Sequence, residues 1–299
     1  MMNQTVSTKD PAAVAREVKA TYQSMFPNGN RLFVPGAFSW ATECFTGGYA
    51  DYQAVDTEYH DFEHTLQGAL CMVRILHGRW KADVNPPLTQ QFFELGLLAI
   101  LLHDTGYLKK RDDMVGTGAK YTATHVSRST DFAAGLLATK GYSTDDIKAV
   151  QNMIRCTGVD ATLTNIPFHD ELEKIVGYAL GTADLLGQMA ADDYVEKLPI
   201  LYDEFAEATN NAPPKSSVVS MFSSAKDLLR KTPDFWDKYV KLKLDRDFGG
   251  VFRYLNKPYP SGDNFYMDKI EDNIRRLREV IANEENTTRF LRKYHAFVL

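Results

Sequence analysis

Two histidines stand four residues apart in the segment YHDFEHT (59–65), among acidic and aromatic residues. On an α-helix this spacing would place His60 and His64 on one face, one turn apart. Two imidazoles so placed could serve a metal ion, one as a ligand and one as a proton donor beside it. Pairs with this spacing also occur by chance on helix surfaces, so the interpretation depends on the other polar residues of the chain.

The dipeptide His103–Asp104 ends the most hydrophobic segment, TQQFFELGLLAILLHD (89–104). Burying an imidazole and a carboxylate costs free energy unless both groups find partners. A divalent cation would satisfy both, because neutral imidazole supplies nitrogen and the carboxylate supplies oxygen and negative charge. Taken alone, the pair is more often a hydrogen-bonded polar end of a helix.

Asp184 is the third unusual residue, since its segment GTADLLG (181–187) is otherwise small and apolar apart from one threonine. An isolated carboxylate in the middle of such a helix is hard to justify. His64, the His103–Asp104 pair and Asp184 would come from three different helices. Facing helices of a bundle can deliver side chains to one point, so these residues could build one metal site.

The elements that must position these residues are helices. Apolar residues recur at a spacing of three to four, and no alternating run longer than about five residues indicates a strand. Thr89 and Ser143 are expected N-caps, and Gly106 is an expected stop. The predicted helices cover 57–79, 89–104, 124–141, 143–158, 171–190, 192–208 and 268–285. We therefore expect an all-α protein.

The clearest break in composition is NNAPPKSSVVS (210–220). It suggests an N-terminal helical extension at 1–54, a helical core at 55–208 and a C-terminal helical segment at 209–299. The C-terminal segment is expected to pack on the core, where it could cap the site or form a homodimer.

The composition is that of an ordinary globular protein, with 299 residues, 44% hydrophobic and 24% charged. The net charge of −5 gives no attraction towards nucleic acid or anionic membranes. No apolar run reaches the ~18–20 residues of a membrane span, and the polar N-terminus lacks the features of a signal peptide. The scattered Cys44, Cys71 and Cys156 are expected to be reduced thiols. We therefore expect a cytoplasmic protein with no nucleic-acid polymer or membrane as a partner.

The order H…HD…D, with these separations, resembles the HD-domain superfamily of metal-dependent phosphohydrolases over roughly residues 55–205. The resemblance implies an HD-domain-like helical bundle with additional N- and C-terminal helices. It also implies a divalent ion (Mn²⁺, Fe²⁺, Ni²⁺, Zn²⁺ or Mg²⁺) whose ligands are His64, His103, Asp104 and Asp184. Asp104 would be the ligand best placed to bridge a second ion, and so a catalytic residue.

YHDFEHT also resembles the YHNxxH stretch of the cyclic-nucleotide phosphodiesterase branch of that superfamily. There the second histidine binds metal, and the first donates a proton to the departing alkoxide. The resemblance therefore makes His64 a ligand and His60 the general acid, a role that suits an imidazole titrating near neutrality. The alternative for His60 is an exposed helix residue or a hydrogen-bonding partner of a ligand.

Other parts of the pattern depart from these branches. HDTGYLKKR (103–111) completes neither HDxxH nor the HDxGK of the cyclic-dinucleotide phosphodiesterases, because Tyr107 occupies the deciding position. His125 matches a histidine that dinuclear members use for a second metal. However, MIRCTG (153–158) has Cys156 and Thr157 where those members carry further histidines. We expect one firm metal site and a weaker second one at Asp104 and His125.

Three cations near the motifs are candidate substrate-binding residues: Lys109, Arg128 and Arg155. Lys109 begins a basic trio, KKR, that is more often solvated surface. The remaining histidines, His77, His169 and His295, are expected to be incidental.

The resemblance, together with these residues, implies a metal-dependent phosphohydrolase acting on a small phosphorylated molecule. A phosphodiester or nucleotide is favoured over a monoester, because His60 would serve a departing alkoxide. Two alternatives stay open. One is an HD-type diiron oxygenase, against which the missing histidines count. The other is a regulatory or ligand-binding HD protein without turnover.

Overall fold

The computed structural model describes residues 6–158, 162–211 and 222–295 of the chain. Within these ranges it contains eleven α-helices and no β-strand, so the all-α prediction is confirmed. The helices are α1 (Pro11–Met25), α2 (Phe33–Phe45), α3 (Phe62–Lys81), α4 (Gln90–Leu102), α5 (His125–Thr139), α6 (Thr144–Ile154), α7 (Glu171–Met189), α8 (Tyr194–Asn211), α9 (Ala225–Phe235), α10 (Phe265–Ile281) and α11 (Glu284–Tyr294).

Short helical turns connect these helices. Five are 3₁₀ turns: η1 (Thr105–Tyr107), η2 (Gly118–Tyr121), η3 (Arg155–Thr157), η4 (Leu163–Asn165) and η7 (Val251–Leu255). Two are π-helical: η5 (Trp236–Val240) and η6 (Lys243–Asp247). The turns η1, η3 and η4 matter most here, because they border the candidate site.

Side-chain caps define where the helices begin. Thr89 and Ser143 cap α4 and α6 as predicted, each accepting a backbone N–H from the first turn. Asp61 caps α3 in the same way, accepting the N–H of His64 at 2.7 Å. The prediction of a helix from residue 57 was therefore wrong at its start, and His60 lies before the helix. Because the cap residue has extended backbone, His60 and His64 do not share a helical face.

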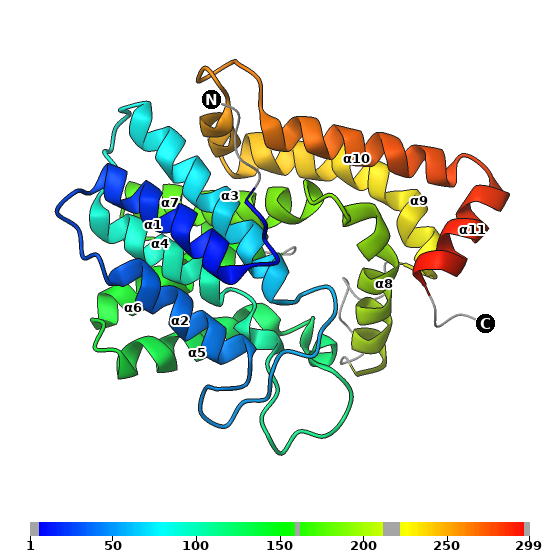
Figure 1. The fold of residues 1–299 in the computed structure, drawn as a ribbon, viewed down its shortest axis with the longest axis horizontal. Coiled ribbons are helices and arrows are strands. Elements are labelled where there is room, and N and C mark those ends of the chain that lie inside the picture. The colour runs from blue at the N-terminus through cyan, green and yellow to red at the C-terminus, as the bar shows by residue number, and fades with distance from the viewer. Residues whose placement is uncertain (1–5, 159–161, 212–221, 296–299) are drawn as a thin grey trace.

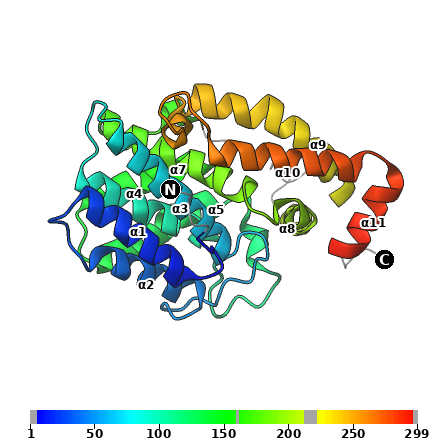
Figure 2. The same cartoon turned by 45° about the horizontal axis from the view of Figure 1, so that its top comes forward.

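The helices form two groups around a central pair (Figures 1 and 2). Helices α3 and α7 cross the middle, with α1, α2, α4 and α6 towards one side and α8 to α11 towards the other. A Cβ atom added at Gly187 of α7 would lie 2.8 Å from backbone atoms of Gln67 and Gly68 in α3. The missing side chain at this position lets the two central helices approach closely.

One hydrophobic cluster extends from Val14 in α1 to Leu277 in α10. It thus includes residues from each of the segments 1–54, 55–208 and 209–299. The expected break at 210–220 falls largely on residues 212–221, outside the described residues. Helices α9 and α10 lie side by side and contact α7 and α8, so the C-terminal segment packs on the core.

None of the helices in the described ranges is long and apolar enough to cross a membrane. Cys44, Cys71 and Cys156 are all free and buried, as expected for reduced thiols.

Candidate metal centre

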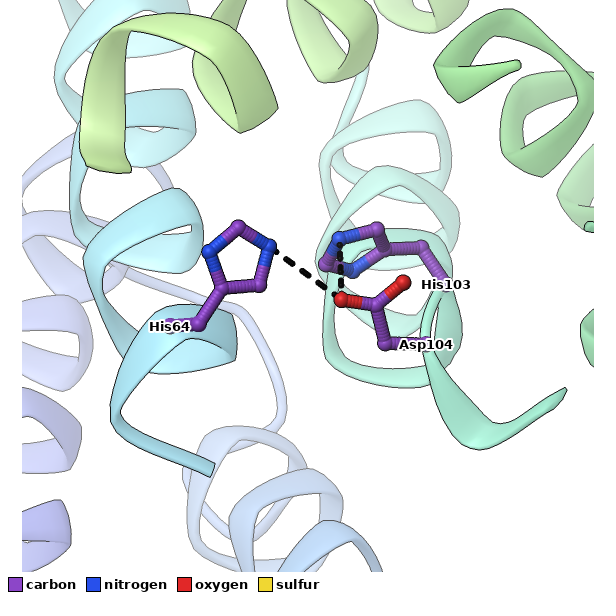
Figure 3. Close-up of side chains that lie close together, drawn as sticks. All are labelled: His64, His103 and Asp104. Carbon is purple, nitrogen blue, oxygen red and sulfur yellow. Dashed lines mark ion pairs between the residues drawn. The ribbon is translucent and has the colours of Figure 1, made fainter. Parts of the chain in front are cut away.

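Four side chains from three helical regions converge at one buried point. His64 comes from α3, His103 and Asp104 follow the end of α4, and Asp184 comes from α7. Nε2 of His64 lies 3.2 Å from Oδ2 of Asp104 and 3.2 Å from Oδ1 of Asp184. Nε2 of His103 lies 3.2 Å and 3.5 Å from the same two oxygens. Figure 3 shows both imidazoles directed at Asp104.

These distances fit a shared cation. Ligand atoms about 2.1 Å from one ion lie about 3.0 to 3.4 Å from one another, depending on the coordination geometry. His103 Nε2 and Asp104 Oδ2 are buried, and neither has a hydrogen-bond partner among the described residues, although they face each other. His64, His103 and Asp104 are only 3%, 1% and 2% exposed, so water does not readily solvate these side chains. Polar atoms left in this way are expensive without a ligand.

Hydrogen bonds from outside the cluster hold two of the four side chains, those of His103 and Asp184, in position. Nδ1 of His103 donates to the backbone carbonyl of Ile100 at 2.8 Å, which leaves the lone pair of the neutral ring on Nε2. Gln188, one turn beyond Asp184, donates to Asp184 Oδ1 at 3.3 Å. Its own amide oxygen accepts the hydroxyl of Tyr59 at 2.6 Å. His103 and Asp184 are thus oriented by partners outside the cluster.

The electrostatics of the cluster are those of two carboxylates that need positive charge. Burial alone would lower the pKa of His64, but contacts with Asp104 and Asp184 outweigh it and raise that pKa to about 10. Burial would likewise raise the pKa of both carboxyl groups, yet the neighbouring histidines hold both well below their usual range. A divalent cation could replace the protons that otherwise balance this charge.

His60 reaches the same place from outside the helix. Its Nδ1 donates to Oε2 of Glu204 in α8 at 2.5 Å, and Glu204 Oε1 accepts the backbone N–H of Tyr59 at 2.7 Å. The rings of His60 and His64 are 5.5 Å apart. A histidine fixed at Nδ1 by a buried carboxylate presents Nε2 for proton transfer. The structure therefore brings His60 beside the cluster, by a route other than the predicted helical pairing.

His125 lies nearby but outside the group of four. It is the first residue of α5, and its Nδ1 donates to the carbonyl of Thr122 at 2.7 Å. Burial lowers its pKa, and the opposing effect of Asp104 is smaller, so the ring is neutral with a lone pair on Nε2. Cys156 lies in the segment MIRCTG (153–158), where the dinuclear HD-domain members carry further histidines. It is buried, and burial raises the pKa of its thiol to about 12, which argues against a thiolate ligand.

Tyr107, at the position that breaks both branch motifs, organises the two outer histidines. The rings of His60 and His125 both stack on it, at 4.6 Å and 4.7 Å between centroids. The preceding Gly106 makes this arrangement possible. A Cβ atom there would lie 2.0 Å from the carbonyl oxygen of His125, and the Gly106 N–H donates to Ser129 Oγ at 2.8 Å.

Two of the three predicted substrate-binding cations are not available to the site. Lys109 is buried, pairs with Asp56 at 2.8 Å and donates to the Gly116 carbonyl. Arg128 donates to the carbonyls of Gly106 and Leu108 at 2.7 Å and 2.8 Å. Both predictions are corrected, because backbone carbonyls and Asp56 already engage these cations and neither side chain borders the cavity.

The cluster opens into a cavity of about 1080 Å³. One end carries Asp104, Asp184, His60 and His125, and Arg155 borders the same space. The rest is mostly apolar and is contributed by several elements, chiefly α7, α8 and α9. Its apolar lining residues include Val126, Ile166, Leu185, Met189, Leu198, Leu201, Phe205, Phe222, Leu228 and Phe235. His77, His169 and His295 lie outside this lining.

Sequence reasoning missed Glu204, Gln188 and the apolar wall. Glu204 lies 144 residues from His60 and belongs to no motif. The one available signal was its place on the buried stripe of α8, with Leu198 before it and Ala208 after it. A carboxylate on such a stripe requires a buried partner, as Asp184 did.

Comparison with known protein families matches residues 12–249 to the sequence model of the Npun_R2479-like family. No curated protein matches the chain. The family match spans α1 to η6 and therefore includes every residue of the convergent cluster, together with His60, His125 and Glu204. Because it covers most of the chain, the protein belongs to the Npun_R2479-like family.

Proposed function

We propose that the protein is a divalent-metal-dependent phosphohydrolase that cleaves a phosphoester, preferably a phosphodiester, of a small molecule. The observation that carries this proposal is the convergence of two imidazoles and two carboxylates within 3.2 to 3.5 Å, with His60 beside them. The same residues carry the resemblance to the HD-domain superfamily.

His64, His103, Asp104 and Asp184 would hold the metal. A divalent ion bound there supplies a Lewis acid for a phosphoryl oxygen and lowers the pKa of a water molecule. The mixed nitrogen and oxygen donors suit Mn²⁺, Fe²⁺, Ni²⁺ or Zn²⁺ better than Mg²⁺, which prefers oxygen alone. A second ion at Asp104 and His125 remains an extension of this proposal.

His60 would serve as the general acid. Glu204 accepts its Nδ1–H, so the proton that His60 transfers would leave from Nε2. A departing alkoxide gains most from this proton, because it is a poor leaving group when charged. This reasoning favours a phosphodiester whose leaving group is an alkoxide over a monoester whose leaving group is acidic.

Arg155 would contribute on the substrate side. It borders the cavity, and its guanidinium is oriented by Asn152 Oδ1 at 2.6 Å. A guanidinium so placed can bind a non-bridging phosphate oxygen.

The first test is hydrolysis of bis-p-nitrophenyl phosphate beside p-nitrophenyl phosphate, with Mn²⁺ added. Wild type should hydrolyse the diester, and Asp104→Ala should lose this activity with its metal. Asp112→Ala removes an exposed carboxylate of the following loop and should behave as wild type. Protein that holds metal but hydrolyses neither ester would contradict the proposal. Turnover that requires O₂ and a coloured iron centre would favour the oxygenase instead.

A further inference from the structure

The cavity has a second region that the phosphoester chemistry does not use. From the metal end it continues between α5, η4 and α7 on one side and α8 and α9 on the other. Resting on the proposed function for its head group, we propose that the substrate is amphipathic. One phosphate group would lie at the metal end, and a bulky alkyl, isoprenoid or aromatic group would fill the apolar region.

The size of the cavity supports a large occupant. Its volume of about 1080 Å³ lies just above the roughly 300–1,000 Å³ typical of small-molecule sites. A phosphate group with two small alcohols would leave most of this space to water. Water in contact with apolar walls is unfavourable, so an apolar group that displaced it would gain free energy.

The charges that line the cavity point to a single phosphate group. Among the described lining residues, Arg155 supplies the one guanidinium and no lysine is present. Asp104, Asp131 and Asp184 contribute negative charge to the same space. A divalent ion and this arginine would carry three positive charges against these three carboxylates, which leaves no excess positive charge for a nucleoside polyphosphate or a dinucleotide, so a phosphoester of low charge is favoured. Of the nucleotides expected from the sequence, those with more than one phosphate are therefore disfavoured.

Several apolar side chains are partly exposed to the cavity, so they can contact a ligand as well as pack against their neighbours. Leu201 and Phe205 of α8 face the cavity and are only partly buried, as are Phe222, Phe235 of α9 and Ile166 after η4. Phe205 and Phe222 stack on each other at 5.9 Å, which gives a flat aromatic wall. An apolar ligand lying between these side chains would complete their burial.

A series of p-nitrophenyl alkyl phosphates tests this inference, because the leaving group stays constant while the chain grows from methyl through butyl and octyl to dodecyl. With all esters below their micelle concentrations, kcat/KM should rise by up to about fourfold per methylene until the apolar region is filled. A rate that is flat or falls with chain length would overturn the inference and leave the phosphohydrolase proposal intact.

Variants on opposite walls locate the effect. Leu201→Gln in α8 and Ile166→Gln after η4 should each flatten the rise with chain length at least severalfold. Leu242→Gln, which changes a leucine that is 45% exposed and outside the cavity, should keep the wild-type slope. An unchanged slope in both wall variants would overturn the placement of the chain.

Binding separates failure of the inference from failure of the proposed function. Calorimetry with monoalkyl phosphates of increasing length needs no turnover. If no ester is hydrolysed but affinity still rises with chain length, and Leu201→Gln abolishes the rise, the amphipathic ligand is supported and the phosphohydrolase proposal is contradicted. Affinity that is independent of chain length would overturn the amphipathic ligand whatever the enzyme hydrolyses.

Discussion

The two ends of the cavity are built in opposite ways. At the polar end, His103 and Asp104 are almost fully buried, and hydrogen bonds to a backbone carbonyl and a side-chain amide orient His103 and Asp184. At the apolar end, Leu201 and Phe205 are partly exposed to the cavity and make no directional bonds. Oriented donors can hold a bound ion in one position, whereas apolar walls can only select for size and hydrophobicity.

On the proposed function, this difference separates the groups that react from the groups that select the substrate. Convergent, buried carboxylates are costly to fold, so their retention calls for a ligand that offsets the cost. Apolar side chains around a hollow cost less and can change without disturbing the cluster. We expect relatives of the same family to share the polar end more closely than the apolar wall.

Removal of one metal ligand at the polar end should have the largest effect of the predicted changes. His103→Ala should weaken metal binding by more than about 100-fold, because even the hydrogen-bonding partners of ligands contribute about 10- to 100-fold. His169→Ala is the matched control, since that side chain is 90% exposed in a loop. Metal content after dialysis, measured by plasma mass spectrometry, distinguishes the two. Wild-type metal content in folded His103→Ala would contradict the site.

Proton donation should show in the choice of leaving group. His60→Asn should lower kcat by about 100-fold for diesters with an alkyl leaving group, in line with general acid catalysis. The loss should be much smaller for p-nitrophenyl leaving groups, which depart without a proton.

Glu204 should act as a positioning residue through His60. Glu204→Gln should produce a smaller loss with the same dependence on the leaving group, and metal content should stay unchanged. Equal losses for both leaving groups in His60→Asn would show that His60 supports the structure rather than transferring a proton.

The pH dependence of ligand affinity should distinguish the two ends next. In the metal-free protein His64 holds a proton up to its raised pKa of about 10. Metal must displace that proton, so metal affinity should rise about tenfold per pH unit for each proton released. Binding of the apolar chain should add no such slope.

Calorimetry in buffers of different ionisation enthalpy measures the proton release directly. A metal affinity that is flat between neutral and mildly alkaline pH would mean that His64 is not a ligand.

The sequence allowed prediction of the polar end because each of its residues is costly where it stands. His103–Asp104 at the end of an apolar helix, and Asp184 among small residues, are visible as local conflicts. The helices followed from periodicity and from caps such as Thr89 and Ser143. The all-α fold was accessible for the same reason.

The rest depended on contacts between distant segments. His60 was placed on a helix because its spacing from His64 suggested one, but the Asp61 side chain begins the helix later. Lys109 and Arg128 were assigned by charge, and only the folded loop shows the groups that already bind them. Glu204 is one of several acids in α8, and its role depends on a contact across 144 residues.

The contact between the two central helices offers the smallest and most local test. Gly187→Ala would place a Cβ atom 2.8 Å from the backbone of α3, which cannot move aside like a side chain. His64 and Asp184 lie within about one turn of this contact, so separating the helices would lengthen the distances between them. We expect a stability loss of about 1–3 kcal/mol and a severalfold weaker metal affinity.

Gly135→Ala is the same substitution in the middle of α5, where nothing lies within 4 Å of the new Cβ atom. It should raise stability by up to about 1 kcal/mol and leave metal affinity unchanged. Urea unfolding and metal titration of both variants test the pair. If Gly187→Ala lowered stability without weakening the metal, the donors would be held by their own hydrogen bonds. The spacing of α3 and α7 would then serve packing alone.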